Sequence, residues 1–196
     1  MSETTTIHIT RSGNTVTYEP AECTLSQLVF WKNDDPQSPH WVYFPGQAGV
    51  GPRFATGPGD TSDPVQPATS IPKGQTNVVV TYACKEAGHE NERGQVTVWP
   101  DFLVVQPITN GVYNQLANGT VGVDYPSTLL TTGGKPNYSH TLTDASMPPG
   151  MAVTNTPAGV AIGGTPTAAG QDYAFTVHCV DALGNRVDQT FTIVVA

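Results

Sequence analysis

Short runs of alternating hydrophobic and polar residues recur along the first hundred residues. Each run is bounded by Gly, Pro, Asn or Asp, which is typical of half-buried strands that end in tight turns. We expect strands over residues 4–10, 15–18, 28–31, 41–44, 77–82 and 95–98. The stretch 45–73 interrupts the pattern because it is rich in Gly, Pro, Asp and Ser, so we expect one large loop there with at most a short strand.

A second set of strand patterns follows a short linker at Trp99, Pro100 and Asp101. We therefore expect two domains, residues 1–100 and residues 101–196. Seven further runs favour strands in the second domain: residues 102–106, 111–116, 120–125, 138–143, 159–162, 172–181 and 188–195. Seven short strands in about a hundred residues are typical of an immunoglobulin-like sandwich.

The clearest alternation lies in the run 172–181. Phe175, Val177 and Cys179 fall on one face of this strand, whereas Thr176 and His178 fall on the other. We therefore expect Cys179 to be buried as a small apolar residue.

Composition supports an all-β fold and argues against some classes of partner. Charged residues make up 12% of the chain, with 20 Gly and 17 Pro, which favours short strands over amphipathic helices. Eight Lys and Arg stand against 16 Asp and Glu without a basic cluster, so we expect no nucleic-acid partner. No apolar run is long enough to span a membrane. The first residues lack the features of a signal peptide, which is typical either of a cytoplasmic protein or of a mature form without its leader.

Three residues of the first domain, His40, Cys84 and His89, have the spacing of a composite metal site. Cys84 ends a strongly β-forming run and His89 follows after four residues, so a loop leaving the strand can bring both side chains to one ion. His40 follows a polar turn and precedes another strand, which lets it approach the same end of a sandwich. Two imidazoles and one thiolate suit copper in electron-transfer sites, because sulfur stabilises Cu(I) and nitrogen supports Cu(II).

In this region the chain resembles the cupredoxin family over residues 15–98. The sequences Tyr-Glu-Pro at 18–20 and Leu-Val-Phe-Trp-Lys-Asn-Asp-Asp at 28–35, followed by His40, are similar to the family's aromatic-x-Pro strand, its next strand and its first His ligand. The sequence Tyr-Ala-Cys at 82–84, then His89 and Gly-Gln-Val-Thr-Val at 94–98, resembles the family's closing Cys, His and Gly-led final strand.

The resemblance implies a Greek-key sandwich whose copper ligands are His40, Cys84 and His89. The family usually places an axial Met two residues before the Gly of its final strand, and this chain has Glu92 there. A carboxylate is harder than a thioether and shifts such a site away from an ordinary blue one. Alternatively, the neighbouring Arg93 holds Glu92 in a surface ion pair.

The resemblance also implies roles beyond the ligands. Asn33 corresponds to the family residue that braces the first ligand loop by hydrogen bonds.

Trp41, Tyr43 and Phe44 either pack in the core, which is usual for aromatic residues in strands, or form an apolar docking surface beside the site. The module would exchange electrons with a redox partner protein. We expect no enzyme activity, because a multicopper oxidase or a reductase needs further copper ligands such as a His-x-His pair.

The second domain resembles the Ig-like repeats of bacterial surface and secreted proteins over residues 103–196. The similarity lies in Thr-Gly-Gly-Lys-Pro at 132–136, Met-Pro-Pro-Gly at 147–150 and Gly-Val-Ala-Ile-Gly-Gly-Thr-Pro at 159–166, which set tight turns. Such families use these modules as spacers or adhesion units. Both resemblances imply a periplasmic or extracellular location.

The cysteines leave a rival interpretation open. Cys23, Cys84 and Cys179 cannot all pair with one another. A Cys23–Cys84 disulfide would remove the thiolate and leave a structural sandwich. The rival function is therefore a non-metal structural or adhesion protein of bacterial surface type with a vestigial cupredoxin fold. The other histidines show no partner pattern and are expected to be ordinary strand or turn residues: His8, His140 and His178.

Overall fold

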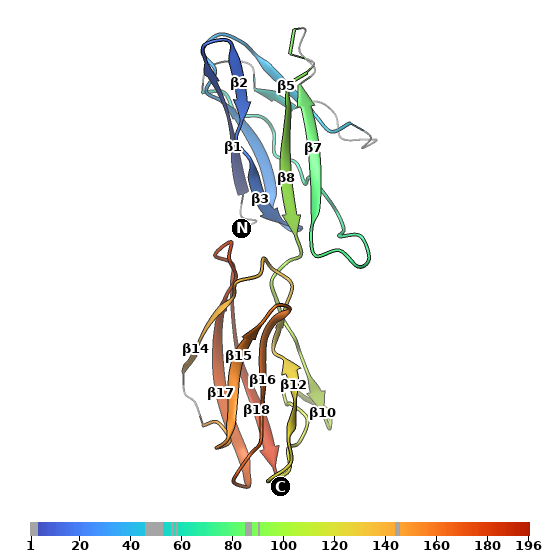
Figure 1. Ribbon diagram of the computed structural model, residues 1–196, viewed down its shortest axis with the longest axis vertical. Coiled ribbons are helices and arrows are strands. Elements are labelled where there is room, and N and C mark those ends of the chain that lie inside the picture. The colour runs from blue at the N-terminus through green and yellow to red at the C-terminus, as the bar shows by residue number, and fades with distance from the viewer. Residues whose placement is uncertain are drawn as a thin grey trace. The chain divides into compact units, whose positions relative to one another are not determined.

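The computed structural model describes residues 4–45, 53–55, 57, 59–84, 88–89, 91–143 and 146–196 (Figure 1). The regular elements within these residues are β-strands. The described residues contain no helix that is long and apolar enough to cross a membrane. The chain divides into two compact units, Met1–Pro100 and Asp101–Ala196, at the residue where the sequence places the linker.

The first sheet of the N-terminal unit joins three strands in the order β2-β1-β4. Strand β1 (Thr4–Ser12) runs antiparallel to β2 (Thr15–Tyr18) and parallel to β4 (Leu28–Asn33). The parallel register places Ile9 opposite Asn33, so the end of β1 beyond Ile9 lies beside the segment that follows β4.

The second sheet of this unit has the strand order β3-β8-β7-β5-β6. Its strands are β3 (Ala21–Thr24), β5 (His40–Tyr43), β6 (Arg53–Ala55), β7 (Val78–Cys84) and β8 (Arg93–Trp99). The sequence pattern misses β3, because Ala and Glu are depleted in strands. It misses the bounds of β6, which lies in the stretch expected as a loop. That stretch also forms bridges to β4 through Thr61 and Val65.

One core holds the two sheets of the N-terminal unit together. Ile7 and Ile9 of β1 and Trp31 of β4 are fully buried in the same cluster as Tyr82 of β7 and Val96 of β8. The rings of Trp31 and Tyr82 meet across the sheets with centroids 5.1 Å apart. The unit is therefore a β-sandwich.

The aromatic residues in and after β5 do not all pack in the core. Phe44 is buried in the core, as predicted from its residue type. Trp41 is 37% exposed, and Tyr43 is half-buried, so the core prediction is wrong for Trp41. The cause is alternation, because His40 and Val42 occupy the inner face of β5 and leave Trp41 on the outer one.

The C-terminal unit contains ten strands within the described residues rather than the seven expected. Its sheets have the orders β14-β17-β18 and β12-β16-β15, with two short pairs, β10-β11 and β13-β9. The bounds are β9 (Leu103–Val104), β10 (Ile108–Thr109), β11 (Val112–Tyr113), β12 (Tyr125–Leu129), β13 (Thr131–Thr132), β14 (Ser139–Thr143), β15 (Met151–Thr156), β16 (Gly159–Gly164), β17 (Gly170–Val180) and β18 (Arg186–Val195).

Both three-stranded sheets contribute to a second core. Phe175 of β17 and Phe191 of β18 are buried in one cluster with Val153 of β15 and Ile162 of β16. Cys179 is 1% exposed on the same face as Phe175, which confirms the alternation predicted for this strand. The prediction of all-β sandwiches is confirmed.

The strand expected over residues 120–125 is wrong except for its last residue. Gly122 has a φ of 75°, which is incompatible with an extended strand, and β12 begins only at Tyr125. Val121 and Val123 flank this glycine and are 40% and 56% exposed. Their alternation in the sequence therefore reflects a turn rather than a buried face.

Candidate metal centre

His40 opens strand β5, and its side chain is fully buried. Its Nε2 lies 2.8 Å from Asp35 Oδ2, whereas its Nδ1 lies 4.0 Å from Cys84 Sγ. A neutral imidazole carries one ring proton, so a carboxylate at Nε2 favours the tautomer protonated there and leaves a lone pair on Nδ1. Burial lowers the pKa of His40, whereas hydrogen bonds with Cys84 and Asp35 raise it. The hydrogen bonds outweigh burial, so the net shift of the pKa is upward.

The loop between β4 and His40 is folded by the side chain of Asn33. Asn33 is fully buried, and its Nδ2 donates to the carbonyl of Ser38 at 2.8 Å. Its Oδ1 accepts from the backbone N–H of Asp35 at 2.9 Å, and Asp35 Oδ1 accepts from the backbone N–H of Gln37 at 2.9 Å. Short polar side chains fold turns in this way. Asn33 thus holds the loop that carries Asp35 and His40.

Asp35 is fully buried and pairs with Arg11 of β1. Arg11 Nε donates to Oδ1 and Arg11 Nη2 lies beside Oδ2, each at 2.8 Å. Burial opposes ionisation of Asp35, but hydrogen bonds from Arg11, the backbone of Gln37 and His40 outweigh it and hold the pKa of Asp35 well below its usual range. The sequence alone does not indicate Arg11 or Asp35 as part of the site, because the two residues meet only through the register of β1 with β4.

Cys84 ends strand β7 and is 1% exposed. Cys84 pairs with Val42 of β5, and His40 lies two residues before Val42, so His40 and Cys84 share a face of the sheet. Cys23, Cys84 and Cys179 are all buried and none of them is in a disulfide, so the Cys23–Cys84 disulfide considered from the sequence is not formed. Burial raises the pKa of the Cys23 thiol to about 12.

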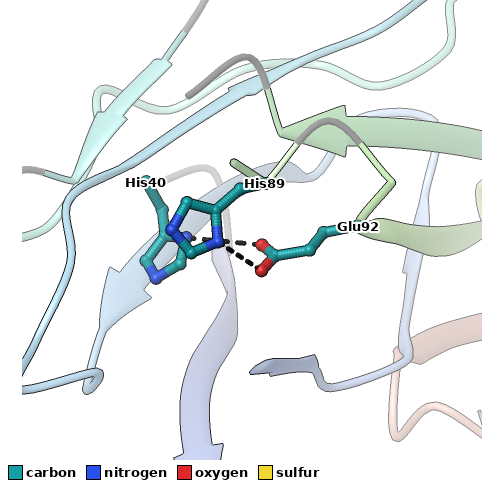
Figure 2. A group of neighbouring side chains, drawn as sticks. All are labelled: His40, His89 and Glu92. Atoms are coloured by element: carbon teal, nitrogen blue, oxygen red, sulfur yellow. Dashed lines mark hydrogen bonds and ion pairs between the residues drawn. The ribbon is translucent and has the colours of Figure 1, made fainter. Parts of the chain in front are cut away.

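His89 and Glu92 lie between β7 and β8. The backbone N–H of Glu92 donates to the carbonyl of His89 at 3.0 Å, and that of Cys84 donates to the carbonyl of Glu92 at 3.3 Å. Figure 2 shows the side chains of His40, His89 and Glu92 directed toward one another. One oxygen of Glu92 bonds to His89 Nδ1, and the other lies 3.6 Å from His40 Nδ1.

The donor atoms of His40, His89 and Glu92 all lie within 4.8 Å of one another. Cys84 is not part of this group, and its Sγ lies 4.0 Å from His40 Nδ1. An ion bound to nitrogen, oxygen and sulfur at about 2.0–2.3 Å holds its donor atoms roughly 3.3–3.8 Å apart. The separation from His40 Nδ1 to Glu92 Oε2, 3.6 Å, lies within this range, and the separation from His40 Nδ1 to Cys84 Sγ, 4.0 Å, lies just beyond it. His40 and Glu92 therefore fit a shared ion, and Cys84 would have to move closer to join them.

Hydrogen bonds with Tyr18 and His89 determine where the Glu92 carboxylate points. The Tyr18 hydroxyl donates to Glu92 Oε2 at 2.9 Å and lies 3.3 Å from His40 Nδ1. Burial, with the nearby Cys84, raises the pKa of Tyr18, so it stays a neutral donor. Arg93 Nη1 donates to the backbone carbonyl of Glu92 at 2.7 Å. Glu92 is thus drawn into the site by Tyr18 and His89. Tyr18 had no signal in the sequence other than its Tyr-Glu-Pro motif.

No family model and no curated protein matches the chain. Among solved structures, an I-band fragment of titin is similar at 10% identity with a TM-score of 0.41, covering 90% of this chain and 62% of that one. An endo-fucoidan hydrolase from glycoside hydrolase family 107 is similar at 18% identity with a TM-score of 0.35, covering 79% of this chain and 22% of that one. The chain thus spans less than two thirds of either protein, and likenesses at this level do not assign it to a family.

Proposed function

We propose that the N-terminal unit binds one copper ion through His40, Cys84 and His89, with Glu92 as a further ligand, and transfers electrons. One observation carries the proposal. His40 is fully buried, its Nε2 is held by Asp35, and its Nδ1 faces the Cys84 sulfur and the Glu92 carboxylate. A histidine with a carboxylate at one nitrogen and convergent donors at the other is the usual arrangement of a metal ligand.

Copper held by this donor set supplies one-electron chemistry between Cu(I) and Cu(II). The chain's own part is to hold the donors and exclude water. Asn33 folds the first ligand loop, Cys84 ends β7, and His89 and Glu92 lie between β7 and β8. For His89 Nδ1 to bind an ion, it must give up its hydrogen bond with Glu92, whose other oxygen stays with the Tyr18 hydroxyl.

The C-terminal unit, in this proposal, is an Ig-like spacer or tether for the copper module. The protein is then a non-enzymatic carrier that meets a redox partner protein in the periplasm or outside the cell. Trp41, beside His40 on the outer face of β5, offers an exposed aromatic side chain for such an encounter.

A second candidate function is supported by the same hydrogen bonds. His40, His89 and Glu92 find partners in Asp35, in Tyr18 and in one another. A polar cluster satisfied in this way can stabilise a sandwich without an ion. The alternative is therefore a structural or adhesion protein with two β-sandwich units.

Loading the purified protein with Cu(II) separates the two functions. We expect one copper per chain and an intense thiolate-to-copper absorption band. The variant Cys84→Ser should lose that band, because the thiolate is the only soft donor in the set. Cys179→Ser, which removes another buried thiol, is the matched control and should keep it. A wild-type protein without the band would contradict the copper function and leave the structural one.

A further inference from the structure

The carboxylate of Asp35 is saturated by contacts from three separate parts of the N-terminal unit. Its Oδ1 accepts from Arg11 Nε at 2.8 Å and from the Gln37 backbone at 2.9 Å. Its Oδ2 lies 2.8 Å from both Arg11 Nη2 and His40 Nε2. Because every contact is at hydrogen-bond distance and Asp35 is fully buried, the carboxylate has little freedom to rotate.

From this geometry we infer that Asp35, clamped by Arg11, is a positioning residue that fixes the tautomer and orientation of His40. For its effect on copper, this inference rests on the proposed function. Asp35 touches no reacting group itself. It acts through the imidazole, by holding the proton on Nε2 and directing the lone pair of Nδ1 toward Cys84 and Glu92.

The clamp is a product of the strand arrangement. Ile9 of β1 lies opposite Asn33 of β4 in the parallel register, so Arg11, two residues on, reaches the loop that carries Asp35. Arg11 Nη2 also lies 3.2 Å from Ser38 Oγ in the same loop. Turning the His40 ring over would break the Asp35 bond and leave a buried N–H without that acceptor, which is unfavourable.

Asp35 also brings a negative charge to the far side of the imidazole. A carboxylate at the second nitrogen raises the basicity of a ligating histidine. A more basic ligand favours Cu(II) over Cu(I), so Asp35 should lower the reduction potential of the centre. An amide at this position keeps the acceptor oxygen and removes the charge, which separates the two effects.

The neighbouring Asp34 provides a matched control. Its carboxylate is partly exposed and pairs with His8 and Lys32 rather than with His40. Asp34→Asn therefore removes the same charge one residue away without touching the ligand.

The test begins with the metal-free protein, in which nitrogen-15 NMR of labelled histidine reports the tautomer of His40. Wild type and Asp34→Asn should show a proton on Nε2. The double variant Arg11→Met/Asp35→Leu, which leaves no unpaired buried charge, should lose this preference. Its affinity for copper, measured by competition with a chromogenic chelator, should fall about 10- to 100-fold. Asp35→Asn should restore the tautomer and most of the affinity, and its reduction potential should be higher than that of wild type.

The outcomes separate the two proposals. A double variant that keeps the wild-type tautomer overturns the positioning role, whether or not copper binds. If that variant does not fold, as judged by circular dichroism, the Asp35→Asn potential decides, and a value equal to that of wild type overturns the role. A wild-type protein that takes up no copper overturns the proposed function, while the tautomer measurement still decides the role of Asp35.

Discussion

Each unit of the chain contains a histidine bonded to an aspartate, yet the two histidines sit in different surroundings. His178 of β17 has its Nδ1 2.9 Å from Asp188 Oδ1 and its Nε2 2.8 Å from Thr143 Oγ1. The side chains of His178 and Asp188 are 38% and 64% exposed, whereas those of His40 and Asp35 are fully buried. Both histidines thus contact a carboxylate through one ring nitrogen, but one pair is exposed and the other is buried.

Strand alternation explains the difference. His178 and Asp188 are register partners on the outer face of their sheet, where water competes for every hydrogen bond. Cys179, the adjacent residue, points to the opposite face and packs in the core. In the N-terminal unit, His40 and Cys84 share the buried face instead. Burial and convergence on one face, rather than a His–Asp pair, therefore distinguish a candidate metal centre from an exposed hydrogen-bonded pair such as His178 and Asp188.

The largest effect that would sharpen this comparison is the loss of copper itself. His40→Ala removes the buried nitrogen donor and should abolish binding of one Cu(II) per chain in isothermal titration calorimetry. His178→Ala should leave the stoichiometry and affinity unchanged, because His178 belongs to no group of convergent donors among the residues that the structure describes. Equal copper binding by the two variants would break the comparison.

Replacing Asp35 should also reduce the stability of the protein more than replacing Asp188. Asp35→Ala leaves a buried ion pair without one partner and should lower the free energy of unfolding by on the order of 3 to 5 kcal/mol. Asp188→Ala removes an exposed partner and should cost about 1 kcal/mol or less. Scanning calorimetry of the full chain measures both. The fluorescence of Trp31, Trp41 and Trp99, the only tryptophans, identifies the transition of the N-terminal unit. A small effect of Asp35→Ala would contradict the clamp.

The pH dependence of stability follows from the lowered pKa of Asp35. Its unfolded value is about 3.9, so the stabilisation is present above that pH and is lost as pH falls toward the lower folded value. We expect the free energy of unfolding of the metal-free protein to fall less steeply below about pH 4 in Asp35→Asn than in wild type. Urea unfolding followed by tryptophan fluorescence measures the slope, and identical slopes would argue against an ionised, paired Asp35.

The smallest effect concerns Glu92, whose carboxylate faces the site. A hard anionic oxygen stabilises Cu(II), so Glu92→Met should raise the reduction potential and shift the absorption of the copper-loaded protein toward blue. Visible spectroscopy and voltammetry detect the change. An unchanged spectrum and potential would show that Glu92 does not bind the metal and only forms hydrogen bonds with Tyr18 and His89.

The sequence predicts strands best where alternation coincides with β-forming residue types, as in β2 and β7. It fails at β3 and β15, whose alanine, glutamate and asparagine residues have low strand propensity and acquire strand structure from their neighbours. At the candidate site, the order of His40, Cys84 and His89 can be recognised along the chain. Arg11 and Asp35 cannot, because their contact spans 24 residues and depends on a parallel register that no local pattern encodes.

X-ray absorption at the copper edge of the loaded protein tests the central claim most directly, because it identifies the atoms bound to the metal. The account predicts one sulfur scatterer and two imidazoles, with the sulfur signal lost in Cys84→Ser and kept in Cys179→Ser. A first coordination shell that contains only nitrogen and oxygen would contradict it, and would leave His40, His89 and Glu92 as a site without the Cys84 thiolate.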